Sequence, residues 1–275
     1  MKNRFNLFDI PIDTDKKDVM ITKIESFLEG SKKHQICTVN SEFIIFSQKD
    51  DIFKKILLNS SLNLADGFGV MWASKFIDLK INNSGLAKII LVIIYWLVYI
   101  IRIPFTPSFF KHPIQERITG SDFIWDIAHI AAKNHSRIFL LGGAPTIAER
   151  TALILQTKIP NLHVSGIHSG NPSQTEEIIE AINKSKASIL MVAYGMPKQE
   201  YWIYNNLNRT NCKIAIGVGG TFDFIAGTRR RAPKWMQKTG LEWLYRLIKE
   251  PRRIIRQLSI PHLMIKVLKY KINEK

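Results

Sequence analysis

The sequence predicts an α/β protein in which a Rossmann-like, mostly parallel sheet carries helices on both faces. Short β-rich segments alternate with helical segments along most of the 275 residues. Polar and glycine-rich turns follow the predicted strands, as expected where a parallel sheet binds ligands beyond the carboxyl ends of its strands. The last 48 residues differ, because they combine basic and large apolar residues. We therefore expect an α/β domain over 1–227 and a basic, helical C-terminal appendage over 228–275.

Each expected element follows from its residue pattern. The strand segments are short and β-rich and end at turn residues, whereas the helical segments repeat apolar residues at helical spacing. The expected strands are Phe8–Ile12, Gln35–Val39, Leu62–Ala65, Arg137–Leu141, His163–Ile167, Ser188–Ala193 and Lys213–Val218. The expected helices are Lys16–Glu29, Glu42–Asn59, Phe123–Lys133, Ile147–Lys158 and Thr175–Lys184.

Composition narrows the class of protein. Hydrophobic residues make up 46% and charged residues 23%, which is ordinary for a globular chain and excludes a disordered, collagen-like or wholly membrane-embedded protein. The net charge of +16 indicates an anionic partner: nucleic acid, phospholipid headgroups or a phosphorylated ligand. The two cysteines, Cys37 and Cys212, lie far apart, so we expect neither a disulfide framework nor a cysteine zinc site. We expect a reducing compartment and identify no secretory signal.

The positive charge is concentrated in the appendage. Residues 228–275 contain fourteen cations and three acids, a net +11. Large apolar residues such as Trp235, Trp243 and Ile255 are interleaved with these cations. This mixture fits an amphipathic segment at an anionic membrane surface. A solvated basic tail is the simpler alternative, and no nucleic-acid-binding motif accompanies the charge.

One apolar run interrupts the α/β pattern. Ile89–Ile101 is thirteen apolar residues without a break. Loop residues precede it at 82–85 and prolines follow it, so we interpret about 78–112 as an apolar insertion. Three interpretations stay open: a buried core helix, a full membrane span, and a membrane-dipping or re-entrant segment. Candidate site residues lie on both sides of the run, which disfavours a single crossing.

Two glycine pairs follow predicted strands. Gly142 and Gly143 follow one strand, and Gly219 and Gly220 follow another. Backbone N–H groups at such turns can hold a phosphate at a helix N-terminus. A tight strand-to-helix turn without a ligand explains each pair equally simply, and neither pair matches a dinucleotide or P-loop motif.

Further candidates lie at the same sheet edge. Asp66, between a strand and a glycine, is placed to act as a general base, although a turn or helix-capping aspartate would look the same. Lys198 and Gln199 follow a strand and Pro197, where they would reach a phosphate and a sugar or base edge. This second signal is weak by itself.

Three arginines in the appendage are spaced for one helix face. Arg246, Arg253 and Arg256 fall within about 80° of one another at 3.6 residues per turn. Such a trio suits a diphosphate, which accepts forked hydrogen bonds from guanidinium groups. The shared face depends on whether Pro251 breaks the helix, and a solvated basic stripe is the alternative.

Two acidic motifs favour structural roles. We expect the run from Asp13 to Asp15 to lie at the start of a helix and favour its dipole, and Asp122 to be an N-cap. We predict no metal site and no cofactor. Serine-hydrolase and zinc-hydrolase motifs are missing from the sequence.

Taken together, these stretches resemble the WecG/TagA/CpsF family of bacterial glycosyltransferases. The resemblance covers nearly the whole chain except about 75–112. It rests on Thr38-Val39-Asn40, Ala65-Asp66-Gly67, Glu116–Asp122, Leu141-Gly142-Gly143, Tyr194–Glu200, Gly217–Asp223, Arg231-Ala232-Pro233, Gly240–Arg246 and Glu250–Arg253.

The resemblance implies an inverting, metal-independent transfer of a sugar from a UDP-sugar to a polyprenyl-diphosphate-linked sugar. It places the enzyme at the cytoplasmic face of the membrane, with the basic appendage docked on the lipid surface. Asp66 would be the general base. The donor would be UDP-N-acetylmannosamine, with the uronic acid or another hexose such as glucose as alternatives. Residues implied in substrate binding are Thr38, Asn40, Arg117, Gln199, Arg246, Arg253 and Arg256.

Two other classes of function remain as hypotheses. A non-catalytic membrane adaptor would bind UDP without turning over any sugar nucleotide. A nucleic-acid-binding protein would explain the charge of +16, and weak, strongly salt-dependent binding in a titration would discard it. The oligomeric state does not follow from the sequence.

Overall fold

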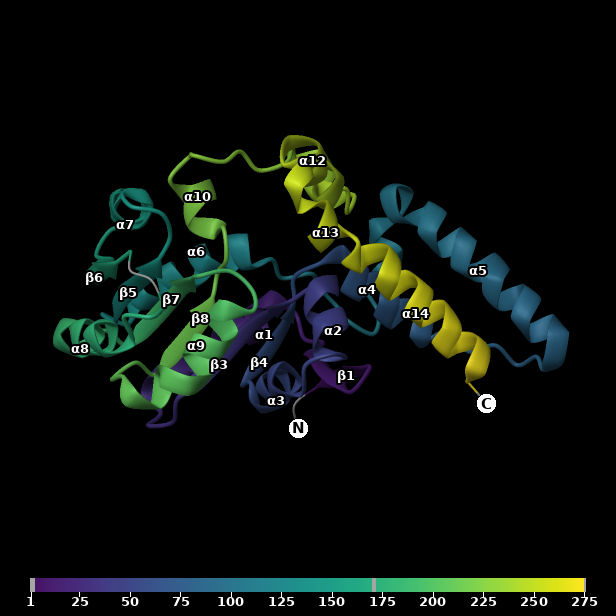
Figure 1. The fold of residues 1–275 in the computed structure, drawn as a ribbon, viewed down its shortest axis with the longest axis horizontal. Helices are drawn as coiled ribbons and strands as arrows, with labels where there is room; N and C mark the ends of the chain where they lie inside the picture. Colours follow the sequence, from purple (N-terminus) through teal and green to yellow (C-terminus); the bar gives the residue numbers. More distant parts are fainter. Residues whose placement is uncertain (1–2, 170–171, 275) are drawn as a thin grey trace.

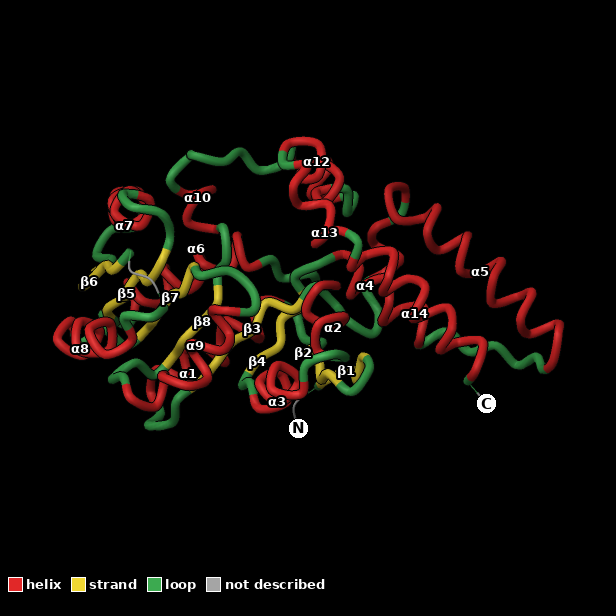
Figure 2. The backbone as a smooth tube through the Cα atoms, in the orientation of Figure 1, coloured by secondary structure: helices red, strands yellow, loops and turns green. Residues whose placement is uncertain are grey.

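The protein is built around a six-stranded parallel sheet with helices on both sides (Figures 1 and 2). A computed structural model describes residues 3–169 and 172–274. The strand order is β4-β3-β8-β7-β5-β6, and every neighbouring pair is parallel. The expected α/β class is therefore confirmed. The strands of this sheet are β3 (His34–Val39), β4 (Leu62–Ala65), β5 (Arg137–Gly142), β6 (His163–His168), β7 (Ile189–Ala193) and β8 (Ile214–Gly217).

The helices fall into three groups. The first packs on one face of the sheet: α1 (Lys17–Glu29), α6 (Gly120–Lys133), α7 (Ile147–Lys158) and α10 (Thr221–Ile225). The second packs on the other face: α2 (Ser41–Ser47), α3 (Asp51–Asn59), α4 (Phe68–Ile77), α8 (Thr175–Ser185) and α9 (Lys198–Asn206) with η2 (Leu207–Arg209). The insertion and appendage supply α5 (Gly85–Phe105), η1 (Pro107–Phe110), α11 (Lys234–Lys238), α12 (Glu242–Lys249), η3 (Pro251–Arg253), α13 (Ile254–Gln257) and α14 (Ser259–Asn273).

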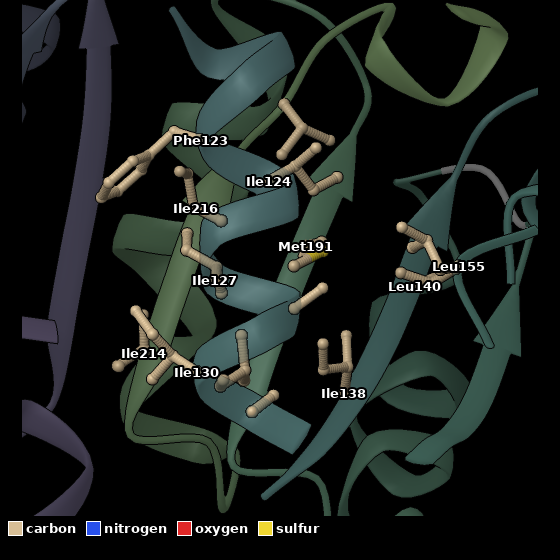
Figure 3. Packing of buried hydrophobic residues seen from close by; sticks show 14 of the residues in the cluster. Phe123, Ile124, Ile127, Ile130, Ile138, Leu140, Leu155, Met191, Ile214 and Ile216 are labelled. Atoms are coloured by element: carbon tan, nitrogen blue, oxygen red, sulfur yellow. The ribbon is translucent and has the colours of Figure 1, made fainter. Parts of the chain in front are cut away.

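Alternation along the strands explains the two covered faces. In β5, Ile138 and Leu140 pack toward α6 and α7, whereas Phe139 and Leu141 pack toward α8. Successive strand side chains point to opposite faces, so a sheet covered on both sides needs apolar residues at every position. Figure 3 shows the α6 side, where the isoleucines of the helix lie against β8, β7 and β5.

The predicted strand Phe8–Ile12 has different bounds and does not belong to the parallel sheet. Residues 4–13 form an antiparallel hairpin, β1 (Arg4–Leu7) and β2 (Ile10–Asp13), outside the main sheet. Phe8 and Asp9 form its turn with φ of 51° and 67°. Two consecutive residues with positive φ match the twist of a two-residue hairpin, which apolar content alone does not reveal.

The predicted helix Glu42–Asn59 is two helices. The side chain of Asp50 accepts a hydrogen bond from the Phe53 N–H at 2.8 Å and so caps α3. Because an N-cap residue has extended backbone angles, it ends the continuity with α2. The apolar periodicity continued across this break and hid it.

The motif from Asp13 to Asp15 does not cap a helix. Lys16 is the N-cap residue of α1 and makes no side-chain capping bond. The buried Asp13 carboxylate instead accepts from Arg4 Nε at 3.2 Å and from the Asn63 N–H at 2.7 Å. It therefore ties the hairpin to β4.

The apolar insertion forms α5, a continuous helix of 21 residues with hydropathy and length sufficient to cross a membrane. Only 11% of its most apolar 18-residue window is buried, so the core-helix interpretation is wrong. The helix lies beside α14 and projects with it from the body (Figure 1). Trp96 Nε1 donates to the Met264 carbonyl at 3.0 Å, and Lys88 donates to the Glu274 carbonyl, so the two helices run antiparallel.

Replacing Asp13 with alanine should lower the free energy of unfolding by about 3 kcal/mol, because it removes the carboxylate that accepts from Arg4 Nε and from the buried Asn63 N–H. Chemical denaturation would measure it. Glu25→Ala is the matched control, since Glu25 pairs with an exposed Lys133 at 2.8 Å and such pairs contribute under about 1 kcal/mol. Equal losses for the two variants would contradict the structural role of Asp13.

Candidate active site

A pocket lies where the carboxyl ends of β3 and β4 meet the appendage. Its walls come from the β3–α2 turn, the β4–α4 turn, Arg117, and the segment from Gly240 through α14. It thus occupies the edge at which open parallel sheets bind ligands. The appendage closes one side, so the pocket requires both parts of the chain.

Six of the predicted site residues line this pocket: Asn40, Asp66, Arg117, Arg246, Arg253 and Arg256. The others, which are not in its lining, are Thr38, Gly142, Gly143, Lys198, Gln199, Gly219 and Gly220. These lie at the ends of β3, β5, β7 and β8 along the same sheet edge.

Asp66 is held beside the start of α6. Its Oδ1 accepts a hydrogen bond from the Gly120 N–H at 3.2 Å, and the Ile118 N–H bonds to the Ala65 carbonyl at 2.9 Å. These bonds bring the Arg117 segment against the end of β4. Burial raises the pKa of Asp66 to about 6, with Arg246 and Arg117 lowering it and Glu242 raising it. A carboxylate with this pKa is mostly ionised near neutral pH and is a competent base.

Pro251 interrupts the helix that was expected to carry the arginine trio. Arg246 belongs to α12, Arg253 to η3, and Arg256 to α13. The three side chains nevertheless line one pocket. Tertiary packing, and not a shared helix face, brings them together.

Each arginine of the trio is paired with a carboxylate. Arg246 Nη2 lies 2.6 Å from Glu242, and Arg253 Nε lies 2.7 Å from Glu250. Arg256 donates from Nε at 2.9 Å and Nη2 at 2.7 Å to Glu42. An anionic ligand would have to share or replace these carboxylates. The Arg246 Nε is buried and has no hydrogen-bond partner in the described structure, so it retains a donor.

Asn40 and Gln199 hold their turns in place. Asn40 caps α2 by accepting from the N–H groups of Glu42 and Phe43. Gln199 is only 3% exposed. Its Oε1 accepts from the N–H groups of Gly195 at 3.1 Å and Gly219 at 3.0 Å. The predicted contact of Gln199 with a donor sugar therefore stays a prediction, and its observed bonds fix the loops after β7 and β8.

The glycine turns adopt conformations that other residues rarely take. Gly142 has a φ of 88° and Gly143 a φ of 86°. A Cβ on Gly142 would also lie 2.8 Å from the Tyr194 ring. Glycine is required there for the backbone itself, and phosphate binding at this turn remains a prediction.

A protein-family model decides the classification. The model of the glycosyl transferase WecG/TagA/CpsF family matches residues 5–91 and 102–275. The chain belongs to this family. It is therefore a glycosyltransferase, and the unmatched residues 92–101 fall within α5.

Curated relatives extend over almost the whole chain. A protein of Staphylococcus aureus strain MRSA252 is 27% identical over 98% of this chain and 93% of its own. A protein of Bacillus subtilis strain 168 is 29% identical over 92% of this chain and 90% of its own. Both are named N-acetylglucosaminyldiphosphoundecaprenol N-acetyl-beta-D-mannosaminyltransferase.

Two acidic residues of this family member were not identified as site residues from the sequence. Glu242 lines the pocket, pairs with Arg246, and lies 3.8 Å from Arg231. Glu42 lines the pocket and holds Arg256. Both sit within or next to the family stretches, but acidic residues are unexpected in a site for diphosphates, so composition alone did not select them.

Asp122 is not an N-cap. The helix begins at Gly120 with Thr119 as its N-cap residue, so Asp122 lies in the first turn. It accepts from the Thr119 hydroxyl at 2.6 Å and from Arg231. Burial alone would raise the pKa of Asp122, but these two partners lower it below its usual value. Asp122 thus links the family's α6 motif to the start of the appendage.

Within residues 3–169 and 172–274, no three His, Cys, Asp or Glu side chains are placed to hold a metal ion. The charges available to neutralise a diphosphate in the described pocket are those of the arginines.

If Asp66 is the general base, kcat/KM should rise through about pH 6 and level off above it, because the carboxylate must be ionised to accept a proton. Glu242→Gln should move this midpoint to lower pH, since losing the nearby negative charge lowers the pKa of Asp66. Glu250→Gln is the matched control and should keep the wild-type midpoint. Glu250 pairs with Arg253 in the same way but is not among the groups that shift the pKa of Asp66. Identical midpoints in all three proteins would contradict Asp66 as the titrating group.

Proposed function

We propose that this glycosyltransferase moves N-acetylmannosamine from its UDP form to a polyprenyl-diphosphate-linked N-acetylglucosamine, for cell-surface polysaccharide or teichoic acid synthesis. The observation that carries the proposal is one pocket lined by the Asp66 carboxylate and by arginines from both parts of the chain. The names of the relatives support this donor and acceptor over a uronic acid or glucose donor.

Asp66 would act as the general base. The acceptor hydroxyl would give its proton to the Asp66 carboxylate while its oxygen attacks the anomeric carbon, and UDP would leave from the opposite side with inversion. The pKa of about 6 makes Asp66 a stronger base than an exposed aspartate while leaving it ionised at neutral pH.

The arginines would stabilise phosphate charge. Arg117, beside Asp66, and Arg246 hold positive charge close to the reacting centre, as their effect on the Asp66 pKa indicates. A guanidinium group can donate two parallel hydrogen bonds to the oxygens of a diphosphate. We assign the trio Arg246, Arg253 and Arg256 to the diphosphate of the donor, the lipid or both. No metal ion is needed in this scheme.

We infer that the enzyme works at the cytoplasmic face of the membrane with α5 lying in the surface. The outward stripe of α5 is apolar and about half exposed at Ile90, Ile94 and Leu97, which is costly in water. The helix α14, which packs beside α5, carries Lys266 and Lys269. If α5 crossed the bilayer, α14 would take these charges into hydrocarbon. An in-plane, membrane-dipping position avoids that cost.

The first test is UDP release in detergent with EDTA, using N-acetylglucosamine on a polyprenyl diphosphate and a panel of UDP-sugars. Acceptor-dependent release should occur with UDP-N-acetylmannosamine. Asp66→Ala should reduce turnover at least about 100-fold, a usual contribution of a general base, with an unchanged circular dichroism spectrum. UDP binding without turnover of any sugar would favour the adaptor hypothesis instead.

A second test concerns the membrane. The triple variant Ile90→Ser, Ile94→Ser and Leu97→Ser should move the protein from anionic vesicles to the soluble fraction in a flotation assay, because each change removes roughly 1–3 kcal/mol of apolar burial. The surface variant Ile52→Ser, Leu58→Ser and Leu153→Ser, which changes exposed apolar residues elsewhere, is the control. Equal flotation of both variants and the wild type would contradict membrane contact through α5.

A further inference from the structure

The pocket is lined by two kinds of side chain. Asp66 and the arginines are charged. The side formed by α5 and α14, which we call the apolar end, contributes Ile103, Ile260 and Met264, and Phe68 of α4 adds to the apolar lining. A ligand that fills the whole pocket would therefore be anionic in one part and apolar in another.

The inserted helix holds the apolar end in place. Val92 and Tyr99 are buried, and Trp96, between them, donates to the Met264 carbonyl at 3.0 Å. Together with Ile103 they form one helical stripe at spacings of four, three and four residues. Tyr99 also packs edge-on against Phe76, with ring centroids 5.3 Å apart. The position of Ile103 thus depends on the part of α5 that the family model leaves unmatched.

The helical segments that line the pocket also carry exposed apolar residues outside it. Leu97 and Ile101 of α5 are 49% and 63% exposed, and Ile255 and Leu258 of the appendage are 79% and 57% exposed. These side chains give α5 and the α13–α14 segment further apolar surface for a long apolar chain that leaves the pocket along them. A water-soluble ligand without an apolar chain would gain no binding energy from these side chains.

We propose that Ile103, Ile260 and Met264 form a groove that binds the first isoprene units of the polyprenyl acceptor, with α5 as one wall. This proposal rests on the proposed function. With the acceptor hydroxyl at Asp66 and its diphosphate at the arginines, the lipid chain is the remaining part of that substrate, and its chemistry matches this end of the pocket. The groove makes α5 an acceptor-selecting element of this chain as well as a membrane contact.

The test compares two acceptors in one detergent. Both carry N-acetylglucosamine diphosphate, one on a three-isoprene chain and the other on a methyl group. The wild type should prefer the isoprenoid acceptor in kcat/KM. Ile103→Ser and, separately, Ile260→Ser should each reduce that preference about tenfold, the scale of losing one apolar contact surface. Leu153→Ser on α7 is the matched control, because Leu153 is an exposed apolar residue that does not line the pocket, and it should keep the wild-type preference.

The outcomes distinguish failure of the groove proposal from failure of the proposed function. Loss of the preference in the groove variants alone, with unchanged thermal midpoints, would support the proposal. A wild type that uses both acceptors equally, or groove variants that slow both acceptors by the same factor, would overturn the groove but leave the transferase intact. Absence of turnover by the wild type with either acceptor would overturn the proposed function and the groove with it.

Discussion

The seating of α14 on α2 and α4 is the contact on which the site depends. Leu263 and Val267 of α14 are 1% and 0% exposed and belong to the same core as the helices that follow β3 and β4. Their burial holds the appendage over the carboxyl edge of the sheet. Without that contact Asp66 would face open solvent, and the burial that raises its pKa would be lost.

Charge compensation shapes the pocket that this contact closes. Three arginines near one another would repel, and Glu42, Glu242 and Glu250 offset that repulsion. The same pairing orients the guanidinium groups, which would favour binding of the proposed diphosphate. Glu242 has a second effect, since it also raises the pKa of Asp66. Substrate binding would therefore change the arginine pairs and the basicity of Asp66 together.

The arm formed by α5 and α14 connects this site to an apolar surface. The inner stripe of α5 packs against α14 and the core, and the outer stripe of α5 is exposed. A helix apolar on all sides needs both a protein partner and an apolar environment. The same helix ends at the pocket through Ile103. In the proposed arrangement, lipid contact and substrate access would thus depend on this single helix.

The sequence by itself determined the parallel sheet, the positions of most of its strands, and the turns that carry Asp66 and Asn40, because alternation and turn chemistry are local. Only the tertiary structure decided that residues 4–13 form a separate hairpin, that Asp122 pairs with Arg231, and that Gln199 bonds to two backbone loops. It also decided that three arginines from separate helical segments share a pocket with α5. These features depend on contacts between residues distant in the chain, which no local pattern contains.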